Sequence, residues 1–226
     1  MTILELSQLE IRYPHDEFHL NVPSLQVESK EKVALIGPSG SGKTSLMNVI
    51  AGIMLPEAGD VYFDGVKVNA LSDRERRQFR LSRIGFIFQD FGLINYLSAL
   101  DNILHTYRIN PALQLKKSVI ERAHSLADSL GVSSLLHKFP HTLSQGEKQR
   151  LAICRALLTQ PQLILADEAT GNLDPANKNK ILEKLFSAVD EHNATLVVVT
   201  HDHALLSHFD RTIHMGDLTG RAQSHA

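Results

Sequence analysis

One stretch of the sequence, residues 37–44, constrains the fold more than any other. It reads Gly-Pro-Ser-Gly-Ser-Gly-Lys-Thr and fits the pattern G-x-x-x-x-G-K-[ST]. The apolar run Val33–Ile36 comes directly before it, and a helical pattern that stops at Gly52 follows it. Glycines let the backbone turn so that successive N–H groups point at one anion, and the start of a helix adds partial positive charge. The sequence therefore predicts a strand, a phosphate-binding loop and a helix in succession.

The side chains of this loop have predicted roles in holding a nucleoside triphosphate and its metal ion. Lys43 can reach the β- and γ-phosphates, and the hydroxyl of Thr44 can bind Mg²⁺. The alternative is a glycine-rich turn without a ligand, but the flanking strand and helix favour the phosphate loop. The glycine order excludes a dinucleotide-binding fingerprint. We expect the nucleotide-binding residues of the loop to be Gly37, Pro38, Ser39, Gly40, Ser41, Gly42, Lys43, Thr44 and Ser45.

Short apolar runs alternate with longer helical patterns along the chain. Runs with almost no polar residues are typical of parallel strands that are covered on both faces. Four such runs are present, at Val33–Ile36, Ile84–Phe88, Leu163–Ala166 and Thr195–Val199. Helical patterns are found at residues 43–51, 116–130 and 175–191. These features predict an α/β core with a mainly parallel sheet.

Two regions depart from this alternation. Residues 3–28 and 59–68 carry strand-like patches, and the second contains the hairpin signal Asp64-Gly65. Residues 90–142 are helical in pattern and hold no strong strand. We therefore predict one domain over residues 1–226: an α/β, P-loop NTPase core with a small antiparallel β subdomain and an α-helical subdomain insertion at approximately 90–142.

Composition excludes several classes of protein. Of the 226 residues, 43% are hydrophobic and 21% charged, which is typical of a globular chain. The 23 Lys and Arg against 25 Asp and Glu leave no bulk charge that would attract nucleic acid or an anionic membrane. The single cysteine, Cys154, excludes an internal disulfide framework. No apolar run is long enough for a spanning helix and no signal peptide is seen, so we expect that the chain does not itself cross a membrane.

A pair of carboxylates follows the third apolar run. Asp167 ends the run Leu163–Ala166, and Glu168 comes next. An acid at this place holds the Mg²⁺ shell in P-loop NTPases, and the neighbouring acid can deprotonate an attacking water. Two solvated acids at the end of a strand are the alternative. With the phosphate loop upstream, we predict that Asp167 is a metal ligand and Glu168 the catalytic base.

The segment Leu143-Ser-Gln-Gly-Glu-Lys-Gln-Arg150 resembles the signature of the ATP-binding cassette (ABC) ATPases, usually L-S-G-G-Q/E. The motifs also follow that family's order over essentially the whole chain: the phosphate loop, Gln89, the signature, Asp167-Glu168, Gly171-Asn-Leu-Asp174 and His201. The residues around Gln89 and Glu168 are most similar to the branch that contains lipoprotein-releasing and macrolide-export cassettes.

The resemblance implies roles for further residues. Gln89 would sense Mg²⁺ and the attacking water, His201 would contact the γ-phosphate, and Tyr13 would stack on adenine. It also implies contacts to nucleotide from the signature and from the later aspartate. The signature of one copy would contact the nucleotide held by the second copy of a dimer. The residues are Ser144, Gln145, Gly146, Glu147 and Asp174.

Each of these residues also has an interpretation without ligand. Ser144 and Glu147 form a capping box, and Asp174 can cap the helix that starts at Pro175. Tyr13 can serve packing, and His201 can be a surface histidine. Gln145 departs from the family pattern, since a glycine is usual there, as do Ala169 (usually proline) and Lys30 (usually glycine). None of these changes removes a charged group or a group that we expect beside the metal ion, so we expect an active ATPase.

The resemblance implies the ATP-binding and ATP-hydrolysing subunit of an ABC transporter, with ATP and Mg²⁺ as cofactors. Two copies would form an ATP-sandwich homodimer and power a separate integral membrane permease, for export or for lipoprotein or lipid extraction. The chain would lie at the cytoplasmic face of the inner (plasma) membrane, held through the permease, with no direct nucleic acid contact. The alternatives are a regulatory ABC ATPase that acts on a membrane partner without transport, and a soluble ABC ATPase that acts on nucleic acid or ribosomes.

Overall fold

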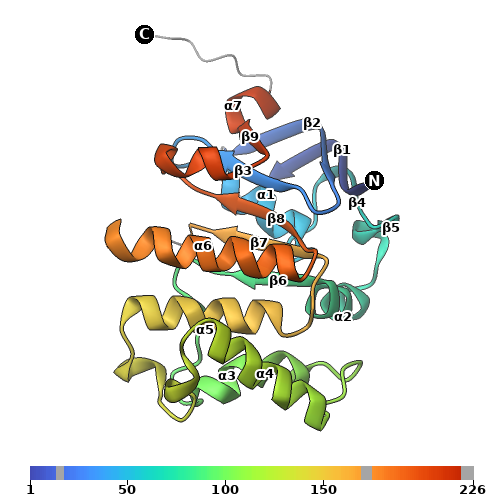
Figure 1. Cartoon of the computed structure of the whole chain (residues 1–226). Helices are drawn as coiled ribbons and strands as arrows, with labels where there is room; N and C mark the ends of the chain where they lie inside the picture. Colours follow the sequence, from blue (N-terminus) through green and yellow to red (C-terminus); the bar gives the residue numbers. More distant parts are fainter. Residues whose placement is uncertain (14–17, 169–174, 220–226) are drawn as a thin grey trace. The chain divides into compact units, whose positions relative to one another are not determined.

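The computed structural model describes residues 1–13, 18–168 and 175–219 of the chain, with residues 175–180 described by their backbone alone. These residues divide between two compact units. The first unit comprises residues 1–80 and 195–226, and the second comprises residues 81–194. The helices and strands are labelled in Figure 1.

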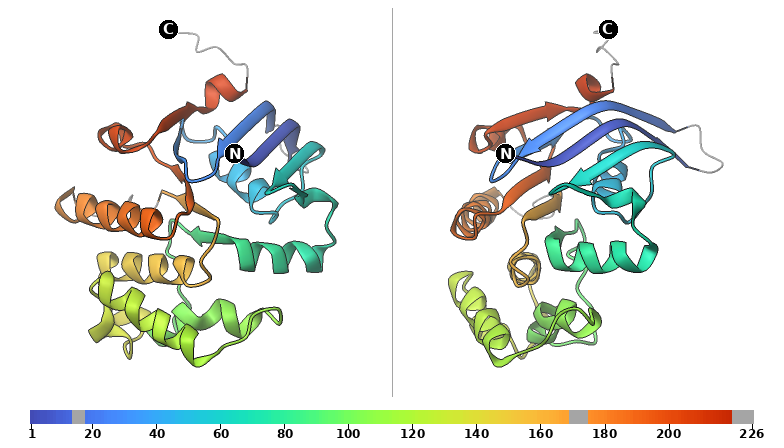
Figure 2. Two further views of the ribbon diagram at one scale, coloured as in Figure 1. Left: turned by 45° about the vertical axis from the view of Figure 1, so that its right-hand side comes forward. Right: turned by 90° about the vertical axis from the view of Figure 1, so that its right-hand side faces the viewer.

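An antiparallel sheet forms one layer of the first unit. Its strand order is β2-β1-β4-β5, from β1 (Thr2–Arg12), β2 (His19–Glu28), β4 (Ala58–Phe63) and β5 (Val66–Lys67). The long pair β1 and β2 is drawn in blue in Figure 2. Asp64 and Gly65 join β4 to β5 with φ of 50° and 76°, as a type I′ hairpin turn requires. The predicted antiparallel layer and its hairpin are confirmed.

Parallel strands form the other layer of the first unit. Strand β3 (Lys32–Ile36) lies between β8 (Thr195–Val199) and β9 (Arg211–His214) and pairs in parallel with both. Strands β3 and β8 are buried along nearly their whole length, which explains their apolar sequences. The helices of this unit are α1 (Lys43–Ile50), α7 (Met215–Leu218) and, for most of its length, α2 (Asp73–Arg83), with 3₁₀ segments at Val68–Ala70 and His203–His208.

The second unit contains the parallel pair β6 (Ile84–Ile87) and β7 (Leu163–Asp167). Its helices are α3 (Ala99–Ile109), α4 (Lys117–Ser129), α5 (Gln145–Leu157) and α6 (Pro175–Glu191), with 3₁₀ segments at Ser133–Leu135 and Pro140–Thr142. Helix α5 contacts α3, α4, α6 and β6, and Figure 1 shows it beside α3 and α4. The buried residues of α5 include Leu151, Ile153 and Leu157, which places this helix in the core of the unit.

The structure confirms the four apolar runs as strands β3, β6, β7 and β8, and the helical character of residues 90–142. Strand β9 and helix α7 were not predicted from the sequence. The prediction of a single domain over residues 1–226 stays a prediction. Among the residues that the structure describes, no helix combines the length and the apolar character that crossing a bilayer requires.

Candidate active site

The phosphate loop connects β3 to α1 in the first unit, as the sequence predicts. Gly40 and Gly42 have φ of 77° and 92°, in the left-handed region that side chains disfavour. A Cβ on Gly42 would also lie 2.6 Å from the ring of Phe18. Gly42 is the residue that precedes the first turn of α1. Glycine at position 42 is therefore required by both the backbone and the space around it.

Lys43 begins α1 and turns its side chain back over the loop. Its Nζ donates to the carbonyl oxygens of Gly37 and Pro38, at 2.8 Å in each case. The side chain is buried, with 6% of the residue exposed. The loop thus holds the lysine cation against its own backbone, at the end of α1 that carries partial positive charge.

A buried hydroxyl in the same loop supports anion binding. Ser41 Oγ has no hydrogen-bond partner within the described part of the chain. A Cβ at Gly37 would lie 2.9 Å from this oxygen, so the absence of a side chain at residue 37 keeps the space beside it open. A buried hydroxyl without a partner is costly, and a phosphate oxygen would supply one. The loop therefore fits the phosphate group that the sequence predicts.

Two further predicted residues belong to the first unit. The hydroxyl of Tyr13 lies 2.9 Å from Ser45 Oγ in α1, and the Tyr13 ring is 5.8 Å from that of Phe18. These contacts support the packing interpretation of Tyr13. Its ring is partly exposed, and stacking on adenine stays a proposal. His201 is exposed and follows β8, whose carboxyl end lies beside that of β3 because the two strands are parallel. It thus lies at the edge of the sheet from which the phosphate loop departs.

Gln89 and the predicted acidic residues Asp167 and Glu168 all lie in the second unit. Strands β6 and β7 are parallel, with Ile87 opposite Ala166, so the residues that follow them emerge at the same edge. Gln89 Nε2 donates to Glu168 Oε2 at 3.3 Å. Asp167, at the end of β7, is 7% exposed. Glu168 has a φ of 46°, a left-handed conformation that non-glycine residues rarely adopt and that is frequent at functional sites.

The predicted signature segment forms the start of α5. Ser144 Oγ accepts from Glu147 N at 3.3 Å, and Glu147 Oε2 accepts from Ser144 N at 2.7 Å, which confirms the capping box. Donation from the Ser144 backbone and hydroxyl lowers the pKa of Glu147 below 4.5. Gly146 lies in this first turn. Contacts from the segment to nucleotide stay a prediction, and Asp174 lies outside the described residues.

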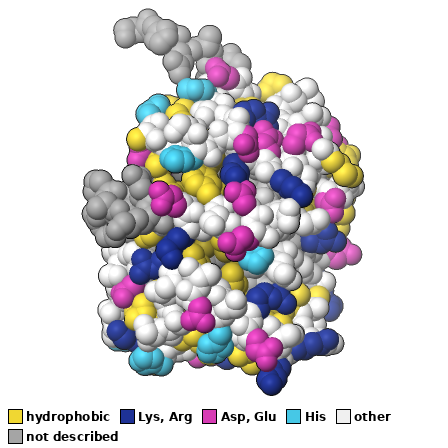
Figure 3. All heavy atoms as spheres, in the orientation of Figure 1, with side chains coloured by type: hydrophobic (Ala, Val, Ile, Leu, Met, Phe, Trp, Pro, Cys, Tyr) yellow, Lys and Arg dark blue, Asp and Glu magenta, His cyan; other side chains and the backbone are white. Residues whose placement is uncertain are grey.

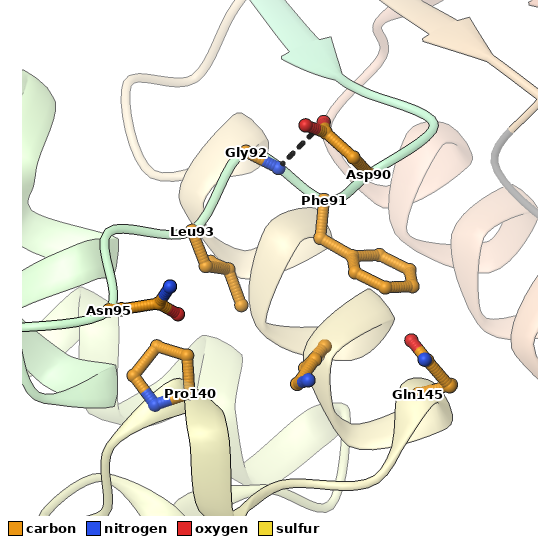
Figure 4. Close-up of a pocket in the computed structure, with 8 residues that line it drawn as sticks. Asp90, Phe91, Gly92, Leu93, Asn95, Pro140 and Gln145 are labelled. Carbon is orange, nitrogen blue, oxygen red and sulfur yellow. Dashed lines mark hydrogen bonds between the residues drawn. The ribbon is translucent and has the colours of Figure 1, made fainter.

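A cavity of about 400 Å³ opens beside the signature segment (Figure 4). The loop after β6 forms one wall, and the first turn of α5 with Pro140 forms the other. The ring of Phe91 points toward Gln145, and Leu93 lies over Pro140. The lining residues are Asp90, Phe91, Gly92, Leu93, Asn95, Pro140, Gln145 and Lys148.

One residue of the site was missed from the sequence. Arg155, on α5, donates from both terminal nitrogens to the backbone carbonyls of Phe91 and Gly92, two and three residues after Gln89. The available signal was a lone arginine in the apolar stretch Leu151–Leu158. That signal does not say which backbone the arginine reaches, because the loop that it contacts is far away in the sequence.

The metal ligands that we predicted are Thr44, Gln89 and Asp167. Among the residues that the structure describes, no group of three or more His, Cys, Asp or Glu could hold a metal ion. Mg²⁺ seldom needs such a group, since it keeps waters and is held by one or two protein oxygens and by the phosphates of its nucleotide. A hydroxyl, an amide oxygen and a buried carboxylate fit that ion.

Comparison with known proteins identifies the family. The family model described as ABC transporter matches residues 20–171. The macrolide export ATP-binding/permease protein MacB of Rhodopirellula baltica is 42% identical over 90% of this chain, which spans only 30% of that relative. The lipoprotein-releasing system ATP-binding protein LolD of Treponema denticola is 38% identical over 83% of this chain and 82% of its own length. These relatives confirm the branch that the sequence predicts.

A solved structure gives the same answer for the fold. The ATP-binding cassette MJ0796, in a dimeric post-hydrolysis state with ADP and Pi, is 33% identical, with a TM-score of 0.83 and 94% of both chains covered. The P-loop NTPase fold predicted from the sequence is thereby confirmed. This chain belongs to the ABC transporter family and is one of its ATP-binding cassettes.

Proposed function

We propose that this cassette binds MgATP, hydrolyses it as a homodimer and drives a separate integral membrane permease. The observation that carries the proposal is the bond from Gln89 Nε2 to Glu168 Oε2, formed at the carboxyl ends of β6 and β7. A glutamine amide can hold a carboxylate in place without titrating, and a carboxylate held in this way can accept a proton from water.

The residues of the phosphate loop would bind the nucleotide. Backbone N–H groups between Gly37 and Thr44 would donate to phosphate oxygens, and Lys43 would exchange its bonds to the loop carbonyls for bonds to the β- and γ-phosphates. Thr44, Gln89 and Asp167 would hold Mg²⁺, which supplies charge neutralisation at these phosphates. His201 would contact the γ-phosphate.

Glu168 would act as the general base. As the water oxygen bonds to the γ-phosphorus, the bond from that phosphorus to the β–γ bridging oxygen breaks, and Glu168 takes the proton of the water. ADP and phosphate are the products. In the dimer, Ser144, Gly146 and the start of α5 would face the nucleotide held by the other copy. Asp174 would also contact nucleotide.

The permease and the direction of transport are proposed from the relatives. Their names include lipoprotein-releasing and macrolide export proteins, so we propose export, or extraction of lipoprotein or lipid, at the cytoplasmic face of the inner membrane. Acidic and basic side chains are mixed on the face drawn in Figure 3. Such a mixed surface supports protein partners rather than nucleic acid.

The test uses the Glu168→Gln chain, which should bind ATP and not turn it over. Size-exclusion chromatography with MgATP is expected to show a dimer, and with MgADP a monomer. The double variant Lys43→Ala/Glu168→Gln is the control and should stay monomeric with either nucleotide. Affinity purification of tagged Glu168→Gln from detergent-solubilised membranes with MgATP should recover a permease. A monomer at saturating MgATP, or recovery of ribosomal proteins alone, would contradict the proposal.

A further inference from the structure

The chain makes an unusual turn directly after β6. Phe91 and Gly92 have φ of 66° and 55°, so two successive residues are left-handed and one of them is aromatic. Phe91 N donates to Phe88 O at 3.0 Å, and Asp90 Oδ1 accepts from Gly92 N at 3.2 Å. A bulky residue at positive φ is strained, and such a conformation persists only where its surroundings impose it.

Arg155 supplies that restraint from helix α5. Its Nη2 donates to Phe91 O at 2.7 Å, and its Nη1 donates to Gly92 O. The guanidinium carbon also lies 5.9 Å from the centre of the Phe88 ring. The planar fork of arginine can reach two successive carbonyls at once, whereas the single ammonium of lysine is a point donor.

The turn has little room for another arrangement. A Cβ on Gly92 would lie 2.8 Å from the Phe88 ring and 3.4 Å from Arg155 Nη2. Burial lowers the pKa of Arg155 to about 10, while Asp90 opposes this shift, so the guanidinium stays protonated at neutral pH. The cation therefore remains a donor to both carbonyls at neutral pH.

Gln89 lies inside this turn, between Phe88 and Asp90, and its amide donates to Glu168. We propose that Arg155 is a positioning residue for hydrolysis: by holding the carbonyls of Phe91 and Gly92, it fixes the turn that places Gln89 on Glu168. Its effect on hydrolysis would be exerted through the turn, by way of its bonds to the Phe91 and Gly92 carbonyls, and not by contact with the nucleotide or the attacking water. The inference rests on the proposed function, since it assigns a residue of helix α5 to the positioning of the proposed catalytic pair Gln89 and Glu168.

A merely structural arginine would join α5 to the loop without affecting Gln89. A double-mutant cycle separates the two roles, because a residue that acts only through Gln89 has no effect once Gln89 is gone. The variants are Arg155→Met and Arg155→Lys, each made in the parent and in the Gln89→Ala chain. Single-turnover ATP hydrolysis with excess protein is measured, together with the ATP concentration for half-maximal rate.

In the parent, Arg155→Met is expected to lower the hydrolysis rate about tenfold while the half-maximal ATP concentration stays within about twofold. Arg155→Lys should restore part of the rate, since lysine can still donate to one carbonyl. In the Gln89→Ala chain, Arg155→Met should change the rate by less than about twofold. An equal loss in both chains, or no loss in the parent, would overturn the inference.

A matched control comes from Arg122 of α4, which also donates to a backbone carbonyl of the same unit, that of Leu158, at 3.0 Å. Arg122→Met should leave the rate within about twofold of the parent. If Arg155→Met does not fold, Arg155→Lys carries the cycle alone, with a smaller expected loss in the parent and less than about a twofold change in the Gln89→Ala chain. Absence of hydrolysis by the parent chain would count against the proposed function. The fold-loss of rate that Arg155→Met causes in the parent, compared with the loss it causes in the Gln89→Ala chain, tests the role of Arg155.

Discussion

Gln89 Nε2 lies 3.3 Å from Glu168 Oε2, although the two residues are 79 positions apart in the chain. Parallel pairing of β6 with β7 brings them together, and Asp167 is buried immediately before Glu168. The amide donates to one oxygen of the carboxylate that we propose as the general base. In the proposed hydrolysis, Glu168 of this pair is the general base and Gln89 holds it in place.

Replacement of Lys43 should weaken nucleotide binding. The ammonium of Lys43 donates to two carbonyls of the phosphate loop, so its loss removes a cation from the loop itself. We expect Lys43→Ala to lower the MgATP affinity by about tenfold or more, measured by isothermal titration calorimetry. Lys117→Ala, at an exposed lysine of α4, is the control and should bind as the parent does. Equal affinity of Lys43→Ala and the parent would show that the loop does not use this lysine.

Removal of the cap from α5 should destabilise the protein. Ser144 Oγ accepts from the backbone N–H of Glu147, and Ser144→Ala leaves that donor without its partner. The expected loss is about 1 kcal/mol in the free energy of unfolding, measured by urea denaturation. Ser118→Ala, in the first turn of α4, is an exposed comparison that should change stability little. An unchanged urea midpoint for Ser144→Ala would mean that water replaces the cap at no cost.

Glu147, the other residue of the capping box, should make the free energy of unfolding depend on pH. Hydrogen bonds from Ser144 lower the pKa of Glu147 below its usual 4.5 in the folded state. A carboxylate with a lowered pKa stabilises the fold above its unfolded pKa, and this contribution is lost as the pH falls through the lowered value. The difference in urea midpoint between the parent and Glu147→Ala should therefore be constant near neutral pH and shrink below about pH 4. A difference that grows on acidification would contradict the assignment.

The close approach of β6 to α5 should make residue 85 intolerant of a side chain. A Cβ on Gly85 would lie 2.5 Å from Ala156 O, a backbone atom that cannot move without moving the helix. We expect Gly85→Ala to cost about 2–3 kcal/mol in urea denaturation. Gly131→Ala is the matched comparison, because its Cβ would meet nothing within 4 Å and only its φ of 68° opposes it. That variant should lose about 1 kcal/mol, and a larger loss at Gly131 than at Gly85 would contradict the packing argument.

The elements that the sequence predicts are those in which the local pattern of residues is typical of the structure that they form. Strand β8 was predicted with its observed limits, because a strand buried on both faces is apolar throughout. The capping box was predicted because both of its residues, Ser144 and Glu147, lie within one turn of the helix. Strand β9 was not predicted, because Arg211, Thr212 and His214 are polar and the strand is only partly buried.

The missed features of the site depend on contacts between distant parts of the chain. The bond between Gln89 and Glu168 requires the pairing of two strands with a long helical region between them. The role of Arg155 requires both the position of α5 and the left-handed conformation of Phe91 and Gly92, and neither is expressed in the local pattern.

The single cysteine should be inert in the folded protein. Cys154 is fully buried on α5, and burial raises the pKa of its thiol to about 12. Because the thiolate is the reactive form, iodoacetamide should leave the native chain unmodified at neutral pH and add one group in urea, as intact mass measures. Rapid alkylation of the native protein would show that α5 opens to solvent.

The most direct test of the account is the ATP hydrolysis rate of purified Glu168→Gln beside that of the parent chain, with MgATP affinity measured for both. Glutamine keeps the size of the side chain and its hydrogen bonding with Gln89, but it cannot take a proton from water. We predict that the rate falls about a hundredfold or more while the affinity stays within about twofold. A rate within about twofold of the parent would contradict the assignment of Glu168 as the base and, with it, the proposed mechanism.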